Sequence, residues 1–288
     1  MANVLITGCS TGIGLATALE FGRAGHTVYA TMRNPIGAPR LGEIARQEAL
    51  PISIVTMDVD SDRSVAETVE RIDDQRGRID ALINNAGIER TGSIEELPME
   101  AFRATMETNY FGALRCIRAV LPKMRESRSG CIINVSSVAG RLACSPFGPY
   151  TASKWALEAL SEVLAQELKA FNVRVAIVEP GIIDTPMARR IETRSGGTHY
   201  PQGVRFAGMF EAALATPRPP SIVAEKIREV VESGTWKLRH PAGPDAEPFL
   251  GWRASMTDEQ WVEWGGLEDD AWYARVQKDF GLDARSKK

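Results

Sequence analysis

The sequence has no long hydrophobic run and no excess of basic residues. None of its apolar stretches reaches the roughly 18 residues that a membrane-spanning helix requires. The formal net charge is −3, so the chain offers no strongly basic surface to nucleic acid or to an anionic membrane. Its first residues, MANVLITG, begin a strand pattern and lack the regions of a secretion signal. We therefore expect a cytoplasmic protein with no membrane span and no nucleic-acid partner.

Cysteine and histidine, which often bind transition metals, are both scarce. The chain has four cysteines and three histidines, and the cysteine spacing matches no metal-binding pattern. We expect no metal site and reduced thiols, because disulfides are rare in cytoplasmic proteins. The cysteines are Cys9, Cys116, Cys131 and Cys144.

Apolar residues, by contrast, are plentiful enough for one large hydrophobic core. The chain of 288 residues is 44% hydrophobic, and short apolar strands alternate with longer helical patterns. This alternation predicts an α/β fold, a single Rossmann-type doubly wound parallel sheet of about seven strands with helices on both faces. Several strands are apolar without alternation, as in a sheet covered on both faces. The predicted strands are residues 4–6, 28–31, 52–57, 79–83, 131–135, 173–178 and 236–240, and the predicted helices are about 12–23, 61–76, 99–125, 149–171 and 221–232.

The last part of the chain differs from the rest in composition. Residues 241–288 hold four of the six tryptophans and many acidic residues, and Trp261, Trp264 and Leu267 have helical spacing. We predict a catalytic domain over residues 1–240 and a Trp-rich helical extension of the same domain over 241–288. The favoured interpretation is that the extension packs its aromatic side chains on the core. A lid over the substrate and an oligomer contact are the alternatives.

A glycine-rich stretch follows the first predicted strand and opens the first helix. Its pattern is Thr7-Gly8-x-x-x-Gly12-x-Gly14. Glycines permit a tight turn and a close approach of the backbone to a pyrophosphate, which the free N–H groups of the helix then bind. The position at the start of a βαβ series is the context that supports a dinucleotide site.

The second predicted strand ends without the acidic residue that usually binds a ribose 2′-hydroxyl. Arg33 stands there instead and can pair with a 2′-phosphate, to which Ser10 or Thr11 can add a hydroxyl. The sequence therefore favours NADP(H) over NAD(H). The alternative is that Arg33 is a solvated surface cation.

Tyr150 and Lys154 lie four residues apart on a predicted helix, which places both on one face. An adjacent ammonium favours the phenolate, so we expect Lys154 to lower the tyrosine pKa from its usual value of about 10. Ser137, at the end of the preceding strand, can hydrogen-bond a carbonyl or alcohol oxygen. Such a trio suits proton exchange with an oxygen while a hydride moves at the attached carbon.

Taken together, these motifs resemble the short-chain dehydrogenase/reductase family over about residues 2–240. Its characteristic segments occur in order, including Asn84-Asn85-Ala86-Gly87, Thr108-Asn109 and Pro180-Gly181-x-x-x-Thr185. The Thr-Gly-Cys-Ser-Thr-Gly opening and Glu158 resemble the branch of 17β-hydroxysteroid and retinol dehydrogenases. The resemblance implies an oxidoreductase that acts on an apolar ketone, aldehyde or secondary alcohol. It also implies a homodimer or homotetramer, often paired through the helices after the fourth and fifth strands.

The resemblance assigns roles by position. Tyr150 would be the general acid/base, Lys154 would also bind the nicotinamide ribose, and Ser137 would hold the substrate oxygen. Asn109 would position a water that links Lys154 to solvent, whereas Ser136 would be structural. The implied cofactor-binding residues are Gly8, Ser10, Thr11, Gly12, Ile13, Gly14, Arg33, Asp58, Val59, Asn85, Ala86, Gly87, Tyr150, Lys154, Pro180, Gly181, Ile183 and Thr185.

Residues 184–220 would form the substrate loop. Its charged residues could contact a polar substrate group, but the favoured interpretation is a solvated loop. Outside this loop, His26 and His240 are expected to be structural. The loop residues concerned are Arg189, Arg190, Arg194, His199 and Arg205.

Two functions of other classes compete with the dehydrogenase. The first is a redox sensor that holds NADP(H) without turnover, which would be expected to lack the tyrosine or the lysine. The second is a dehydratase or epimerase on a nucleotide sugar, which would be expected to hold NAD tightly in a longer substrate domain. The presence of Tyr150 and Lys154 argues against the sensor, and Arg33 together with the short segment after Thr185 argues against the dehydratase or epimerase.

Overall fold

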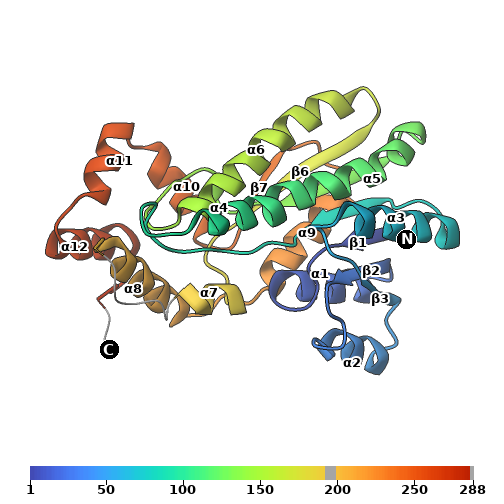
Figure 1. The fold of residues 1–288 in the computed structure, drawn as a ribbon, viewed down its shortest axis with the longest axis horizontal. Helices are drawn as coiled ribbons and strands as arrows, with labels where there is room; N and C mark the ends of the chain where they lie inside the picture. The colour runs from blue at the N-terminus through green and yellow to red at the C-terminus, as the bar shows by residue number, and fades with distance from the viewer. Residues whose placement is uncertain (192–198, 286–288) are drawn as a thin grey trace.

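A parallel sheet of seven strands forms the centre of the computed structural model, which describes residues 1–191 and 199–285 (Figure 1). The strand order is β3-β2-β1-β4-β5-β6-β7, and every neighbouring pair is parallel. The chain begins at β1, winds outward to β3, and then crosses back to build the other half from β4. The predicted doubly wound fold is confirmed. The strands are β1 (Asn3–Ile6), β2 (Thr27–Met32), β3 (Ile52–Thr56), β4 (Ala81–Asn84), β5 (Gly130–Val135), β6 (Val173–Pro180) and β7 (Arg239–Ala242).

Helices cover both faces of the sheet. Val4 and Ile6 of β1 pack toward one helical layer, whereas Leu5 between them packs toward the other, because successive strand residues point to opposite faces. Both layers are apolar, which explains why the strands do not alternate with polar residues. The first layer contains α1 (Gly12–Arg23), α2 (Arg40–Gln47) and α9 (Ser221–Ser233), and the second contains α3 (Asp62–Arg76), α5 (Gly112–Glu126) and α6 (Gly148–Lys169).

The predicted long helix over 99–125 is divided by a change of helical pitch. It consists of α4 (Met99–Met106), a π-helical turn η1 (Glu107–Phe111) and α5. A π turn inserts one residue into the helical repeat and is frequent at functional sites. Side-chain periodicity does not reveal so local a change. The sequence also gave no prediction of α2, and it placed the seventh strand three residues too early.

The C-terminal helices gather at one end of the molecule, far from the N-terminus (Figure 1). Phe249 and Phe280 of these helices join a cluster of buried side chains that includes Phe206 and Phe147. The tail aromatics therefore pack on the core, as the favoured interpretation predicts. The helices of this end are α7 (Pro186–Ile191), α8 (Gln202–Leu214), α10 (Ala246–Ala254), α11 (Asp258–Gly265) and α12 (Asp269–Phe280).

The described residues also bear on the expectations for thiols and membranes. All four cysteines are free, and burial raises the pKa of Cys131 to about 11, which disfavours the reactive thiolate. No helix within residues 1–191 and 199–285 has the length and hydropathy to cross a bilayer. The location in the cytoplasm stays a prediction.

Candidate active site

The glycine-rich loop lies where the carboxyl ends of β1 and β4 meet. Gly8 and Gly12 have φ angles of +73° and +58°, a region that residues with a Cβ rarely adopt. The N–H of Cys9 donates to the carbonyl oxygen of Thr31 at 2.9 Å, which fixes the loop against the end of β2. The turn therefore requires glycine at two of the three predicted positions.

Gly14, the third glycine, permits close packing of α1 on the loop. A Cβ built there would lie 2.3 Å from the carbonyl oxygen of Gly8 and 2.4 Å from Nδ2 of Asn85. The Asn85 amide donates to the carbonyl oxygens of Thr7 and Gly8 at 2.9 and 3.2 Å, so it ties β4 to the loop. Thr7 Oγ1 in turn accepts from the backbone N–H of Ala86 at 2.9 Å.

The first turn of α1 presents its N–H groups to this loop. Thr11 is the N-cap, and its side chain makes no capping hydrogen bond. A helix N-terminus with free N–H groups, preceded by a glycine-rich backbone that a ligand can approach closely, fits a pyrophosphate. Among the neighbours, Ser10 is partly buried, Thr11 is exposed, and Ile13 packs against the core beneath the loop.

Asn109 lies in the π turn and connects three segments. Its Oδ1 accepts from the N–H of Ile88 at 2.8 Å, and its Nδ2 donates to the Ile88 carbonyl and to Ser153 Oγ, each at 2.9 Å. Ser153 Oγ donates in turn to the carbonyl oxygen of Tyr150 at 2.7 Å. Gly87 lies beside this amide, since a Cβ on it would be 3.3 Å from Asn109 Oδ1.

Lys154 is a buried ammonium one helical turn from Tyr150. Only 4% of the residue is exposed, and Nζ donates to the carbonyl oxygen of Val135 at 2.8 Å. Nζ lies 5.5 Å from the centroid of the Tyr150 ring. Burial lowers the pKa of Lys154 to about 8, although the nearby Glu158 carboxylate opposes this shift.

Tyr150 does not have the lowered pKa that we predicted. Burial raises the pKa of its phenol to about 12, and the negative charge of Glu89 acts in the same direction. A hydrogen bond with the Ser137 side chain opposes the shift. The prediction fails because removal of the phenolate from water outweighs the attraction of an ammonium that bonds to Val135 instead.

The two serines after β5 face different ways. Ser137 Oγ accepts from the N–H of Ala139 at 3.1 Å at the start of a short 3-10 helix, η2 (Val138–Gly140), and interacts with Tyr150. Ser136 is buried, and its Oγ lies near the Glu158 carboxylate, where it opposes the rise of the Glu158 pKa on burial. The structure therefore brings Ser137, Tyr150 and Lys154 together and directs Ser136 away from them, as predicted.

The segment after β6 closes the site from the other side. Thr185 reaches the glycine-rich loop, because a Cβ on Gly12 would lie 3.3 Å from Thr185 Cγ2. Ile183 is buried in the core. Pro180 ends β6, and the N–H of Gly181 donates to the carbonyl oxygen of Ala242 at 3.0 Å.

The predicted adenosine-side residues lie at the ends of β2 and β3. Arg33 is exposed, and its charge acts on the partly buried Asp60, whose pKa is raised by burial. Asp58 Oδ1 accepts from the N–H of Asp60 at 3.2 Å. Val59 packs against Gly112, since a Cβ built on that glycine would lie 2.9 Å from Val59 Cγ2. Within the described residues no hydrogen bond or ion pair occupies Arg33.

The predicted substrate loop is solvated at Arg189, Arg190 and His199, as we favoured, but not at Arg205. It forms α7 and α8, and Arg205 on α8 is buried, with 4% of the residue exposed. Arg189 pairs with Asp184 at 2.7 Å, His199 is exposed, and Arg194 lies outside the described residues. His26 and His240 hydrogen-bond the backbone, as expected of structural histidines.

Sequence reasoning missed Glu89, which is 4% exposed and acts electrostatically on Tyr150. It also missed Ser153, which joins Asn109 to the Tyr150 backbone. The only available signal for Glu89 is a charged residue directly after the Asn-Asn-Ala-Gly-Ile run at the end of β4.

Comparisons with known proteins agree with this geometry. A family profile described as short chain dehydrogenase matches residues 2–196. Retinol dehydrogenase 8 of Bos taurus is 39% identical over 266 residues, which cover 87% of this chain and 84% of that protein. The crystal structure of a short-chain dehydrogenase from Streptomyces avermitilis has a TM-score of 0.78 and 31% identity, and covers 92% of this chain and 96% of that one. An actinorhodin polyketide ketoreductase variant with NADPH has a TM-score of 0.73 and 27% identity, and covers 83% and 95%.

The chain belongs to the short-chain dehydrogenase/reductase family and is similar to its retinol dehydrogenase branch. It is an oxidoreductase that acts on CH–OH groups with NAD(P), as the resemblance of its motifs implied.

A buried pair of carboxylates lies beyond Lys154, away from the glycine-rich loop. Glu158 follows Lys154 by one turn of α6, and Glu179 is on β6, with 4% and 1% of these residues exposed. Arg239 lies 3.0 Å from Glu158 and 3.8 Å from Glu179, and it also pairs with the exposed Glu162. Burial, together with the Glu158 charge, raises the pKa of Glu179 to about 7.

We predict that Glu179 makes the folded protein less stable as pH rises through neutrality. The folded chain retains this proton up to about pH 7, whereas the unfolded chain loses it near 4.5, so the stability falls between these values. Glu179→Gln is expected to raise the unfolding free energy at pH 8 by at most about 3 kcal/mol, and to change it little at pH 4. Urea unfolding at several pH values measures the difference.

Glu162→Gln is the matched control. Glu162 is also an ion-pair partner of Arg239, but its side chain is 51% exposed, so its carboxylate is solvated. The effect of this variant is expected to be small at every pH. If both variants change the unfolding free energy equally at pH 8, the pH-dependent loss of stability does not come from Glu179.

Proposed function

We propose that this oxidoreductase uses NADP(H) to interconvert a ketone or aldehyde with an alcohol on an apolar substrate. The observation that carries the proposal is the convergence of Tyr150, Lys154 and Ser137 beside the loop of Gly8, Gly12 and Gly14. The dinucleotide supplies the hydride. The roles of the side chains follow from their protonation and contacts.

Tyr150 is the general acid in reduction. Because burial raises its pKa to about 12, the phenol holds its proton at neutral pH and can donate it to the oxygen of the reduced carbonyl. Ser137, which already interacts with Tyr150, hydrogen-bonds the same substrate oxygen. In oxidation the tyrosine accepts the proton of the alcohol.

In the oxidative direction the Lys154 charge, 5.5 Å from the Tyr150 ring centroid, partly offsets the cost of forming the phenolate. The Lys154 pKa of about 8 leaves most of the ammonium charged at pH 7. The bond to Val135 uses one N–H, so two remain for the ribose hydroxyls of the dinucleotide. Asn109, joined to the Tyr150 backbone through Ser153, positions a water on the path from Lys154 to solvent.

The cofactor contacts follow the order of the carboxyl ends of the strands. The glycine-rich loop and the first turn of α1 bind the pyrophosphate, with Ser10, Thr11 and Ile13 in the loop. Asp58, Val59, Asn85, Ala86 and Gly87 contact the adenosine half. Pro180, Gly181, Ile183 and Thr185 contact the nicotinamide half.

An apolar substrate is supported by the surroundings of Tyr150. The Phe147 ring stacks on the Tyr150 ring at 4.4 Å, and Phe206 lies 5.1 Å from Phe147. Leu142 and Ile182 belong to the same buried cluster. The similarity to retinol dehydrogenase 8 is consistent with such a substrate.

Tyr150→Phe tests the role of the general acid. The variant keeps the stacked ring and loses the proton donor, so ketone reduction is expected to fall by about 10²–10⁴-fold while NADPH binding is retained. Steady-state rates with a panel of ketones and fluorescence titration with NADPH measure the two properties. Tyr273→Phe on α12 is the control, and its rates are expected to be unchanged.

The same comparison tests the redox-sensor alternative. A sensor without turnover would show no reduction of any ketone by the parent protein and no change in Tyr150→Phe beyond NADPH affinity. If the parent protein reduces ketones and Tyr150→Phe does so at the same rate, Tyr150 is not the general acid.

The preference for NADP(H) is assigned to Arg33. Its exposed guanidinium follows β2, and the glycine-rich loop is hydrogen-bonded to the same strand end. A guanidinium can bind a 2′-phosphate with paired hydrogen bonds. No acidic residue in Ala30-Thr31-Met32-Arg33 would bind a 2′-hydroxyl instead.

Arg33→Ala is expected to weaken NADPH binding by about tenfold to hundredfold and to leave NADH binding nearly unchanged. Arg40→Ala, an exposed cation on the neighbouring α2, is the control. Titrations at low and moderate salt give both affinities. A parent protein that prefers NADH would contradict the assignment.

We also propose a homodimer or homotetramer that pairs through α5 and α6. Phe111 precedes α5, and Trp155 and Val163 lie two turns apart on α6, with 43%, 48% and 54% exposed. Val163→Glu is expected to shift sedimentation velocity toward the monomer, because a charge cannot be buried unpaired in an apolar interface. Ile36→Glu, at an exposed site between β2 and α2, is the control. A monomeric parent protein would contradict the proposal.

A further inference from the structure

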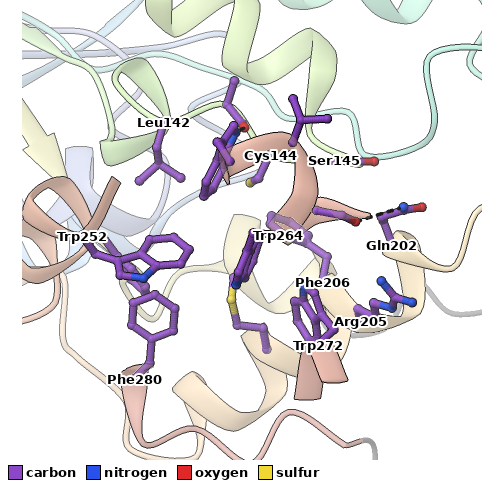
Figure 2. Close-up of a pocket in the computed structure, with 16 residues that line it drawn as sticks. Leu142, Cys144, Ser145, Gln202, Arg205, Phe206, Trp252, Trp264, Trp272 and Phe280 are labelled. Atoms are coloured by element: carbon purple, nitrogen blue, oxygen red, sulfur yellow. Dashed lines mark hydrogen bonds between the residues drawn. The ribbon is translucent and has the colours of Figure 1, made fainter. Parts of the chain in front are cut away.

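A cavity of about 180 Å³ lies between the loop before α6, helix α8 and the C-terminal helices (Figure 2). Its wall is mostly apolar and includes Met209, Phe206 and Phe280. All four tryptophans of the tail contribute to it. These are Trp252, Trp261, Trp264 and Trp272.

Three buried polar atoms of the lining residues have no hydrogen-bond partner within the described residues. They are Nη1 of Arg205, Oε1 of Gln202 and Nε1 of Trp264. A buried group left unpaired costs about 1–3 kcal/mol, so its presence requires an explanation. The indoles of Trp252 and Trp261 do have partners, at 3.1 Å on Asp279 and 2.7 Å on Ala143.

Gln202 and Arg205 lie together in one part of the wall, and Trp264 is connected to them through Trp272 and Gly265. Gln202 and Arg205 are one turn apart on α8, and Figure 2 shows them side by side. Gln202 Nε2 donates to the carbonyl oxygen of Gly265 at 3.4 Å, directly after Trp264. The Arg205 guanidinium carbon is 5.9 Å from the Trp272 ring, which is 5.6 Å from the Trp264 ring.

The chemistry of these groups matches an uncharged hydroxyl. Arg205 and Trp264 offer donors and Gln202 offers an acceptor, whereas a hydroxyl can accept and donate. Asp269 already neutralises Arg205, with oxygen–nitrogen distances of 2.7 and 2.6 Å. A second carboxylate in the cavity would therefore lack a free counter-charge and would pay the full cost of burial.

The size of the cavity limits the group that can enter. A dry apolar cavity of about 150 Å³ in another protein binds benzene, so 180 Å³ suits one six-membered ring. Tyr150 does not line the cavity, and two successive ring contacts connect them, from Tyr150 to Phe147 and from Phe147 to the lining residue Phe206.

We propose that this cavity binds the end of the substrate remote from the reacting carbonyl, and that this end is a single uncharged ring with a hydroxyl group. The inference rests on the proposed function, since it names the substrate class for the same site. It assigns Arg205 and Gln202 to the recognition of the hydroxyl group.

Binding is tested first without dinucleotide, by tryptophan fluorescence and calorimetry with cyclohexanol and cyclohexanecarboxylate. Cyclohexanol is expected to bind and to change the fluorescence, and the carboxylate to bind at least about tenfold more weakly. Cys144→Phe, which fills the cavity from a lining position, is expected to abolish binding, whereas Cys144→Ala retains it. Equal affinity for the two compounds, or unchanged binding in Cys144→Phe, would overturn the proposal.

Arg205→Met tests the polar recognition. It keeps most of the apolar volume and leaves an Asp269 whose side chain is 63% exposed and can be hydrated. Cyclohexanol affinity is expected to fall about tenfold, with the cooperative thermal unfolding retained. Gln202→Leu replaces it if that variant does not fold. Unaltered affinity in the folded variant would exclude the role of these polar groups.

Turnover separates this inference from the proposed function. With hydroxyphenyl butanone, Cys144→Phe is expected to raise KM at least about tenfold relative to Cys144→Ala, whereas the rate with acetone stays the same. If Cys144→Phe turns over both ketones as the parent protein does, the inference about the cavity is overturned and the proposed function stands. Cyclohexanol binding in a parent protein that reduces no ketone would overturn the proposed function and leave the cavity as a binding site.

Discussion

The close contact between α1 and the end of β1 is the constraint on which the site depends. Because Gly14 has no Cβ, the first turn of the helix can approach the carbonyl oxygen of Gly8 and the Asn85 amide. Asn85 binds that carbonyl and its neighbour, so the same contact fixes the end of β4. A larger residue at position 14 would separate the helix N-terminus from the strand ends and displace both halves of the dinucleotide site.

Burial determines the protonation of Tyr150 and Lys154 on α6. It raises the pKa of Tyr150 to about 12 and lowers that of Lys154 to about 8, so both groups are driven toward their uncharged forms. The two shifts move the proton affinities of phenol and ammonium apart, from ordinary pKa values of 10.0 and 10.5 to about 12 and about 8. At pH 7 the phenol therefore keeps its proton, whereas the ammonium is close to the pH at which it loses one.

The sequence determined the fold and the candidate site to different extents. Apolar strands separated by helical patterns were sufficient to predict the sheet, and the order of motifs placed Ser137, Tyr150 and Lys154 together. The Tyr150 pKa was mispredicted because its burial depends on packing that local sequence does not show. Phe147, the N-cap of the same helix, stacks on the Tyr150 ring, and Phe206 of the distant α8 packs on Phe147. The π turn at Asn109 was missed because one inserted residue does not alter the apolar pattern of the helix.

Arg205 shows most clearly what a local pattern cannot reveal. In sequence it is one of several arginines in a variable loop, but α8 directs it into the tail, where Asp269 and Trp272 cover it. A guanidinium with an exposed carboxylate partner gains little from that pair alone. Its burial is better explained if the unpaired Nη1 bonds a ligand oxygen, because only then does the arginine recover the hydrogen bond that it lost on leaving water.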